Sequence, residues 1–310
     1  MKGKKLRLVL LTALLAALLL APAVQAGDAA GKGDTPAAND CATRYPVVLV
    51  HGAGFRDKTL GLVNYWGRAP EMLEAQGARI FYGGTDGWGN VEDGAAILKA
   101  TVEEVLAETG SAKVNLVAHS KGGLESRYMI SSLGMAGKVA SLTTISTPHG
   151  GSVVMDKILG VPDFLLRGAA GIVNISSRIL GDGRPDFYAG IQYFGTQQME
   201  AFNKANPNRP GVYYQSFAGA LYAPASDIIL SIPAFWIKNA DGPNDGMVTV
   251  ESAKWGRFRG VLQGTGYRGV SHADEVDLRR TDLAIQPLLG AETVTGFYAA
   301  MVSELKAKGY

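Results

Sequence analysis

Short apolar runs alternate with stretches of helical periodicity through most of this chain. Val47 to Val50 is a continuous apolar run, as in strands that are buried on both faces. Between residues 90 and 110 apolar side chains recur at helical spacing, with Asn90 as the expected N-cap and Gly110 as the stop. Strands that alternate with helices over short connections favour a parallel sheet covered by helices on both faces. We therefore predict an α/β fold.

The same two patterns predict the other elements. After Pro148 the alternation of strand and helix patterns stops. Ser152 to Asp186 is expected to form two or three short amphipathic helices, either as extra core helices or as a mobile cap over a site. No repeat or interdomain linker is visible, so we predict one domain over residues 45–310, with a lid insertion around residues 152–186. Strands are expected at 79–82, 113–118, 139–146, 212–218, around 247–250 and at 260–263, and helices at 64–76, 121–133 and 293–306.

A predicted signal peptide, residues 1–26, opens the chain. Basic residues precede an apolar run from Leu8 to Ala21, and the small residue Ala26 suits the position before a cleavage site. The run is short for a bilayer core of about 30 Å, so we expect cleavage rather than an uncleaved anchor. Residues 27–44 are predicted to be a disordered leader. The mature protein is expected to be secreted or periplasmic, with no stable membrane span.

Charge and cysteine content exclude several classes of function. Thirty Lys and Arg against 28 Asp and Glu give a net charge of +2, and the four bases of the signal peptide account for that surplus. Binding to nucleic acid is therefore not expected. Cys41 is the single cysteine, so the chain has no internal disulfide. Its place within the predicted leader, near a flexible terminus, argues against a catalytic thiol.

The strongest chemical signal lies at residues 115–124, where a predicted strand meets a predicted helix. The sequence there is Asn-Leu-Val-Ala-His-Ser-Lys-Gly-Gly-Leu, with Ser120 at the junction. This order is typical of a nucleophile elbow, a sharp turn that presents a hydroxyl group above the carboxyl edge of a sheet. Ala118 and Gly122 must be small because the turn brings the two backbones close together. We predict that Ser120 is a nucleophile.

A serine hydroxyl needs a neighbouring base at neutral pH, and histidine is the usual one. The chain has four histidines. His272 follows the last predicted strand and fits the chain order Ser, acid, His, so it is the preferred base, with His149 as the competitor. His119 is expected to project away from its neighbour and to pack. His51 lies in the loop after the first strand, a position that suits an oxyanion site.

Asp245 is the predicted acid that holds the base in its working tautomer. It lies in an Asn-Asp-Gly turn between strand candidates, although Asp-Gly pairs are also common in plain turns. Asp241 and Asp227 are the alternatives. The backbone N–H groups of Lys121, directly after the nucleophile, and of Ala53, after the first strand, are predicted to form the oxyanion hole.

Five blocks of residues occur in the order found in bacterial secreted triacylglycerol lipases, and over residues 45–280 the chain resembles that family of α/β-hydrolases. The resemblance implies an α/β-hydrolase fold with a mostly parallel sheet, a triad of Ser120, Asp245 and His272, and hydrolysis of carboxylic esters, with medium- or long-chain acyl glycerides as the substrate class. It also implies the oxyanion pair Ala53 and Lys121 and a lid over residues 152–186. The blocks are residues 51–52, 118–123, 147–152, 244–246 and 272–276.

The resemblance also bears on cofactors and metals. The expected reaction needs no cofactor. Several of these lipases hold a structural calcium ion near the catalytic histidine, and Asp274 matches one of its carboxylates. The segment Ala223 to Asp227 has no aspartate at the matching place, and Leu278 replaces a side-chain carbonyl group. A Ca²⁺ ion held through Asp274 therefore stays open, whereas a zinc site that needs histidines in residues 60–110 has none.

The predicted partner is a lipid or ester substrate, met at an oil–water interface. A short-chain carboxylesterase, a polyester hydrolase and an acyltransferase would carry the same triad, so the sequence leaves them open. A non-catalytic lipid-binding protein is disfavoured because no triad member is missing. A dehydrogenase is also disfavoured because no G-x-G-x-x-G pattern follows the first predicted strand.

Overall fold

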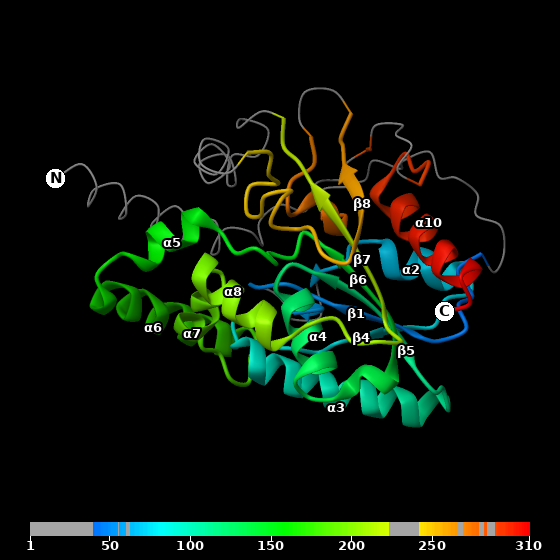
Figure 1. The fold of residues 1–310 in the computed structure, drawn as a ribbon, viewed down its shortest axis with the longest axis horizontal. Helices are drawn as coiled ribbons and strands as arrows, with labels where there is room; N and C mark the ends of the chain where they lie inside the picture. Colours follow the sequence, from blue (N-terminus) through cyan, green and yellow to red (C-terminus); the bar gives the residue numbers. More distant parts are fainter. Residues whose placement is uncertain are drawn as a thin grey trace.

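A six-stranded parallel sheet forms the centre of the computed structural model (Figure 1). The strand order is β4-β1-β5-β6-β7-β8, which confirms the predicted α/β class. The strands are β1 (Val47–Val50), β4 (Ile80–Tyr82), β5 (Val114–His119), β6 (Val139–Ile145), β7 (Tyr213–Gly219) and β8 (Arg257–Leu262). A separate antiparallel pair joins β2 (Lys58–Thr59) and β3 (Val63–Asn64). The structure describes residues 40–54, 56–59, 63–222, 242–265, 269–278, 282–283 and 289–310.

Helices cover both faces of this sheet, and β1 shows why its sequence is apolar throughout. Val47 and Leu49 pack with α2 and α10 on one face, whereas Val48 and Val50 pack with α3 on the other face. Because successive strand residues point to opposite faces, a strand covered on both sides has no exposed position. The helices are α2 (Ala69–Ala75), α3 (Val91–Thr109), α4 (Lys121–Ser131) and α10 (Val294–Ala307).

The ends of the long helices follow local capping chemistry. The Asn90 side chain accepts the backbone N–H of Asp93 at 2.7 Å and opens α3, and Gly110 closes it with φ 64°. Thr293 caps α10 in the same way through the N–H of Gly296. Each cap satisfies a backbone donor that the first helical turn leaves without a partner. The predicted starts of both helices are confirmed.

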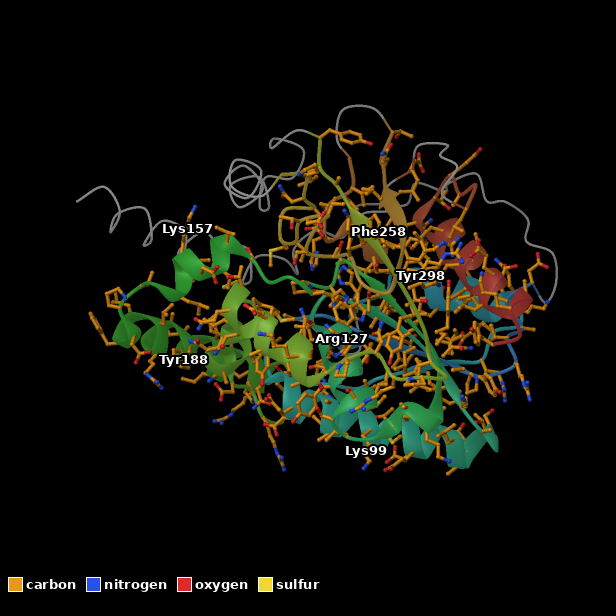
Figure 2. The ribbon with its side chains drawn as sticks, viewed as in Figure 1. Lys99, Arg127, Lys157, Tyr188, Phe258 and Tyr298 are labelled. Atoms are coloured by element: carbon orange, nitrogen blue, oxygen red, sulfur yellow. The ribbon has the colours of Figure 1, made fainter. Side chains whose placement is uncertain are left out.

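Four helices are inserted between β6 and β7, at the side of the molecule that Lys157 and Tyr188 mark in Figure 2. Helix α6 buries Leu166, Ala170 and Val173 on its inner face, so the predicted helical insertion is present. The insertion continues beyond residue 186. Its helices are α5 (Val153–Leu159), α6 (Asp163–Ile179), α7 (Phe187–Gln192) and α8 (Thr196–Ala205).

Two predicted elements differ in the structure. The helix expected from residue 64 begins only at Ala69, because a turn precedes it. In this turn the backbone carbonyl of Asp57 accepts the backbone N–H of Tyr65 at 3.0 Å. The carboxylate of Asp57 accepts the indole N–H of Trp66, also at 3.0 Å. Pro70 then suits the first turn of the helix. Residues 247–250 form turns with one isolated bridge rather than a strand.

Cys41 lies in the hydrophobic core rather than in a loose leader. Its thiol is fully buried and donates to the Gln76 side chain at 3.2 Å. Burial, reinforced by the charge of Asp40, raises the pKa of the thiol to about 11, so it is a poor nucleophile. The predicted signal peptide and residues 27–39 of the predicted leader lie outside the described residues. Among the helices that are described, none has the length and apolar character needed to cross a membrane.

Candidate active site

Ser120 lies where β5 turns into α4. Its backbone has φ 54° and ψ −128°, a conformation that non-glycine residues rarely adopt and that surrounding contacts must maintain. The Ser120 N–H donates to the carbonyl of Ile145 at 2.9 Å, and the Thr147 hydroxyl donates to the Ser120 carbonyl at 2.8 Å. The neighbouring strand β6 and the loop after it therefore hold the strained turn, as the predicted elbow requires.

Small residues next to Ser120 permit the close approach of strand and helix. A methyl group on Gly122 would overlap the backbone carbonyl groups of Val50 and His51 at the end of β1. A methyl group on Gly123 would overlap the Thr147 side chain. These overlaps explain why glycine follows the Ser-Lys pair, as expected for Gly122 from the sequence.

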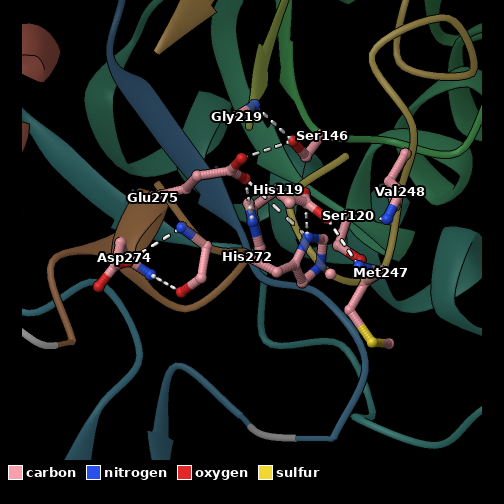
Figure 3. A network of polar contacts seen from close by, with 12 residues as sticks. His119, Ser120, Ser146, Gly219, Met247, Val248, His272, Asp274 and Glu275 are labelled. Carbon is pink, nitrogen blue, oxygen red and sulfur yellow. Dashed lines mark hydrogen bonds and ion pairs between the residues drawn. The ribbon is translucent and has the colours of Figure 1, made fainter. Parts of the chain in front are cut away.

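His272 and Asp245 come together from two separate loops. His272 Nδ1 lies 2.7 Å from Asp245 Oδ2. The backbone N–H of His272 also donates to the backbone carbonyl of Asp245 at 2.9 Å. Figure 3 places His272 in one close group with Ser120, and the ring of the adjacent His119 lies 4.4 Å from the His272 ring, centroid to centroid. The structure thus brings the predicted base and acid into contact beside the predicted nucleophile.

Asp245 is fully buried, yet its environment favours the ionised form. Its Oδ1 accepts the backbone N–H groups of Met247 and Val248, each at 2.8 Å. Burial by itself would raise the pKa of Asp245, but the charge of His272, the hydrogen bond from its ring and the two backbone hydrogen bonds lower that pKa below its ordinary value. The turn that replaced a predicted strand at residues 247–250 is what supplies the two amides.

A second carboxyl group, that of Glu275, also lies close to His272, but its pKa is shifted in the direction opposite to that of Asp245. Its Oε2 is 4.0 Å from His272 Nδ1. Complete burial, followed by the negative charge of Asp245, raises the pKa of Glu275 well above its ordinary value. Two carboxyl groups whose pKa values are shifted in opposite directions take different roles. The charged partner of His272 is therefore Asp245.

His119 belongs to a buried polar network, not to a packing layer as predicted. Its Nδ1 lies 2.6 Å from the Tyr65 hydroxyl oxygen, and its Nε2 lies 3.0 Å from Glu275 Oε2. The Ser146 hydroxyl contacts Glu275 Oε1 at 2.7 Å (Figure 3). Burial, reinforced by the charge of His272, lowers the pKa of His119 well below its ordinary value, so the ring stays neutral. The sequence analysis missed Tyr65, Ser146 and Glu275; the position of Glu275, three residues after His272, was the available signal.

His149, the competing base, is engaged elsewhere. Arg127 Nη1 lies 3.1 Å from its Nδ1, and the Thr144 hydroxyl lies 3.1 Å from its Nε2. Its ring stacks on Trp255 with centroids 5.2 Å apart. Burial and the charge of Arg127 lower the pKa of His149 well below its ordinary value. These contacts make His149 a residue that fixes the loop after β6.

The two predicted oxyanion donors flank Ser120. Gly52 packs so closely that an added methyl carbon would lie 2.7 Å from the Ser120 Cβ atom, and Ala53 follows it as a half-buried residue. Lys121 opens α4, so its N–H has no acceptor within the helix. Its side chain points away, donating to the Asp86 carbonyl at 2.9 Å and pairing with Glu125, so only its backbone is available to a substrate.

The inserted helices reach these residues. A cluster that includes Trp88, Leu166 and Phe187 packs against Ala53 and against Met247, which binds Asp245. The opposite face of α6 is exposed and apolar, with exposed fractions of 73% at Phe164, 67% at Ile172, 64% at Ile175 and 74% at Ile179. Ile158 and Leu166 are buried, so these two apolar side chains pack inside the insertion.

Two places bear on metal binding. Asp274 is buried, and its Oδ2 accepts the Ser271 N–H at 2.9 Å, so this carboxylate helps to hold the turn that carries His272. The second half of the calcium pattern, at residues 223–227 with the alternative acid Asp227, lies outside the described residues, as does Asp241. Within the described part of the chain, ligand atoms of His119, His272 and Glu275 lie within 4.8 Å of one another.

Known proteins resemble this chain over most of its length, although no protein-family model matches it. A triacylglycerol lipase of Vibrio cholerae is 30% identical over 295 residues, which cover 86% of this chain and 89% of the relative. A triacylglycerol lipase of Burkholderia plantarii is 29% identical over 334 residues, covering 86% and 92%. Triacylglycerol lipase 2 of Saccharomyces cerevisiae is 28% identical over 262 residues, covering 80% and 75%.

Solved structures support the fold. The metagenomic carboxyl esterase MGS0156 has a TM-score of 0.66 at 18% identity, covering 92% of this chain and 82% of its own. The mature Bacillus licheniformis lipase BlEst2 has a TM-score of 0.56 at 22% identity, covering 80% and 89%. The chain therefore belongs to the triacylglycerol lipase family, has the α/β-hydrolase fold and is a carboxylic ester hydrolase.

Proposed function

We propose that Ser120, His272 and Asp245 form a catalytic triad that hydrolyses triacylglycerols through an acyl-enzyme. The observation that carries this proposal is the 2.7 Å contact between His272 Nδ1 and a buried, ionised Asp245, beside a serine in a strained turn. No other described histidine has this combination: His119 is bonded on both ring nitrogens within a neutral network, and His149 is held by Arg127.

In the proposed reaction, Asp245 accepts Nδ1–H and leaves Nε2 of His272 free to take the Ser120 proton. The Ser120 oxygen then attacks the ester carbonyl, and the negative oxygen is stabilised by the N–H groups of Ala53 and Lys121. His272 returns the proton to the alcohol as the ester C–O bond breaks. Water attacks the acyl-enzyme in the second half, with His272 again taking and returning one proton.

The exposed face of α6 favours a lipid surface over a dissolved substrate. Phe164, Ile172, Ile175 and Ile179 recur at helical spacing, so they form one stripe on the outside of the molecule. The inner face of the same helix belongs to the cluster that touches Ala53. Contact between this stripe and an oil droplet would therefore act on a helix whose inner face belongs to the cluster packed against Ala53 and Met247.

We further infer export of the mature enzyme after removal of residues 1–26. The support is the basic start, the short apolar run and the small residue at position 26. An expressed full-length chain should appear outside the cytoplasm with Gly27 as its first residue, as N-terminal sequencing would show. Retention of Met1 on the exported protein would contradict this inference.

The central experiment compares wild type with Ser120→Ala on p-nitrophenyl esters from acetate to palmitate and on emulsified triacylglycerol. The proposal expects wild-type rates to rise towards long chains and the variant to lose hydrolysis while keeping its circular dichroism spectrum. A short-chain optimum would favour the carboxylesterase alternative with the same triad. Hydrolysis that survives in a folded Ser120→Ala protein would refute the triad.

The role of the lid surface needs a separate pair of variants. Ile172→Glu places a charge on the exposed stripe, whereas Glu251→Gln alters an exposed residue outside the insertion. Ile172→Glu should keep its rate on dissolved p-nitrophenyl acetate and lose about tenfold on emulsified triacylglycerol, which corresponds to about 1.4 kcal/mol of apolar contact. Glu251→Gln should change neither rate. Equal rates of Ile172→Glu and wild type on the emulsion would exclude a lipid-binding role for the stripe.

A further inference from the structure

We propose that His119, Glu275 and His272 form a binding site for Zn²⁺ and that the bound ion stops hydrolysis by occupying the base of the triad. The inference rests on the proposed function, because it makes the ion a reversible inhibitor of the same site. Ligand atoms of the three residues lie within 4.8 Å of one another, with His119 and Glu275 buried and His272 half-buried. Two imidazole groups and one carboxylate form a donor set that binds Zn²⁺ in proteins, with water as the fourth ligand.

The donor atoms are spaced as a small ion requires. Glu275 Oε2 lies 3.0 Å from His119 Nε2 and 4.0 Å from His272 Nδ1. In a tetrahedral site with zinc bonds of about 2.0–2.1 Å, neighbouring ligand atoms are about 3.3 Å apart, a value between these two distances. Figure 3 shows the three side chains directed toward one another. A small movement of the His272 ring toward the other two ligands would therefore complete the site.

Hydrogen bonds on the far side of two of the ligands hold them in place. His119 Nδ1 lies 2.6 Å from the Tyr65 hydroxyl oxygen, and the Ser146 hydroxyl donates to Glu275 Oε1 at 2.7 Å. Contacts of this kind, made by the atom of a ligand that does not bind the metal, orient the side chains of metal sites. They direct Nε2 at the end of β5 and Oε2 on the 3₁₀-helix Asp274–Val276 to the same point.

The charge around this point favours a cation. Burial, reinforced by the negative charge of the ionised Asp245, raises the pKa of Glu275, so the Glu275 carboxyl group holds a proton. A dication in place of that proton would balance the two carboxylates in a buried space, where an unbalanced charge is costly. The imidazole groups select the metal, because Ca²⁺ and Mg²⁺ prefer oxygen ligands whereas Zn²⁺ binds imidazole well.

Zinc at this site would disable His272 through the position of one proton. The ion takes Nδ1, so the ring keeps its proton on Nε2, where it can no longer accept the Ser120 proton. Glu275 releases its carboxyl proton to water, and the His119 ring keeps its proton on Nδ1, beside the Tyr65 hydroxyl. The ion therefore inhibits without touching the nucleophile, and its removal restores the working tautomer.

The first experiment titrates untagged wild-type protein with zinc sulfate against a chromophoric zinc chelator and follows hydrolysis of p-nitrophenyl butyrate in the same samples. We expect one inhibitory ion per chain, with half of the rate lost at the free Zn²⁺ concentration that half-fills the site, and full recovery after EDTA. Ca²⁺ and Mg²⁺ at the same concentrations should leave the rate unchanged. Zinc that binds without inhibition, or equal inhibition by Ca²⁺, would overturn the inference.

Glu275→Gln keeps the size of the side chain and removes the anionic ligand. It should weaken Zn²⁺ binding by at least about tenfold, the lower end of the loss that follows removal of even an outer contact of a ligand. The zinc concentration that halves the variant's own zinc-free rate should rise by the same factor. Glu251→Gln, which neutralises an exposed carboxylate, should bind zinc and respond to it as wild type does. The same zinc sensitivity in Glu275→Gln and wild type would refute the site.

Failure of this inference is distinguishable from failure of the proposed function. Zinc affinity is measured without turnover, so Ser120→Ala should bind the ion as tightly as wild type. If Ser120→Ala is inactive and zinc does not inhibit wild type, only the zinc site fails; if a folded Ser120→Ala hydrolyses esters, the proposed function itself fails. Should Glu275→Gln misfold, X-ray absorption at the zinc edge of the wild-type complex decides the matter. Two imidazole groups bound to the zinc support the inference, and one or none overturns it.

Discussion

Asparagine in place of Asp245 should reduce kcat by about 10⁴-fold without disturbing the fold, because it would reverse the hydrogen bond to His272. The substitution keeps the shape of the side chain and removes its charge. Asp245 Oδ1 accepts two backbone N–H groups, from Met247 and Val248, and Oδ2 accepts Nδ1–H of His272. An asparagine has one carbonyl oxygen and one NH₂ group, so it can satisfy only one of these two sides.

The contacts decide which side the oxygen takes. An NH₂ group facing Met247 and Val248 would leave two buried donors without an acceptor, at about 1–3 kcal/mol each. The oxygen therefore stays with the amides, and the NH₂ group faces His272 Nδ1. The ring must then accept at Nδ1 and carry its proton on Nε2, where it can no longer take the serine proton. A loss of about 10⁴-fold corresponds to about 5.5 kcal/mol of transition-state stabilisation.

The assay is kcat on p-nitrophenyl butyrate, with thermal unfolding and circular dichroism as checks on the fold. Glu251→Gln is a matched control, since it also neutralises a carboxylate but at an exposed position. Its kcat should stay within about twofold of wild type. If Asp245→Asn keeps more than about a tenth of the wild-type kcat in a folded protein, Asp245 does not set the tautomer of His272, and the reasoning is wrong.

Three further predictions concern stability, measured by urea unfolding. The pKa of Glu275 is raised in the folded state, so the wild-type protein loses stability as pH rises above the ordinary pKa of 4.5. The unfolding free energy of Glu275→Gln should therefore exceed that of wild type by a margin that grows from about pH 5 to pH 8. A margin that stays constant over this range would contradict a neutral carboxyl group. Gly122→Ala should lose about 1–3 kcal/mol through overlap with β1, whereas Gly168→Ala, with nothing within 4 Å on α6, should gain about 0.5–1 kcal/mol. Asn90→Ala should lose about 1 kcal/mol through the missing cap of α3, and an unchanged midpoint would refute that role.

Features that depend on neighbours along the chain were predictable. The apolar run of β1, the cap at Asn90, the stop at Gly110 and the turn at Ser120 each depend on a few consecutive residues. A strand that is buried on both faces favours apolar side chains. A helix end favours a side-chain acceptor at its start or a residue in the left-handed conformation at its close. Such local requirements leave a mark in the sequence wherever the element occurs.

The error at residues 247–250 shows where that local information ends. Met247, Val248 and Val250 are good strand residues, but the Asp245 carboxylate takes the first two amides and bends the segment into a turn. Competition between a side chain and a neighbouring strand for the same N–H groups depends on whether such a strand is present. Here tertiary structure overrides the propensity of the residues.

By itself, the sequence determined the α/β class, the elbow at Ser120 and the pairing of one acid with one histidine as candidates. Only the tertiary structure decided that His119 contacts Glu275 across 156 residues, that Tyr65 contacts His119 across 54, and that the His51 ring contacts the Thr85 carbonyl group across 34. These partners lie on different elements, and nothing in the chain near one residue specifies the other. Packing of the sheet and its helices brings them together, and the same burial that removes water sets which groups carry charge.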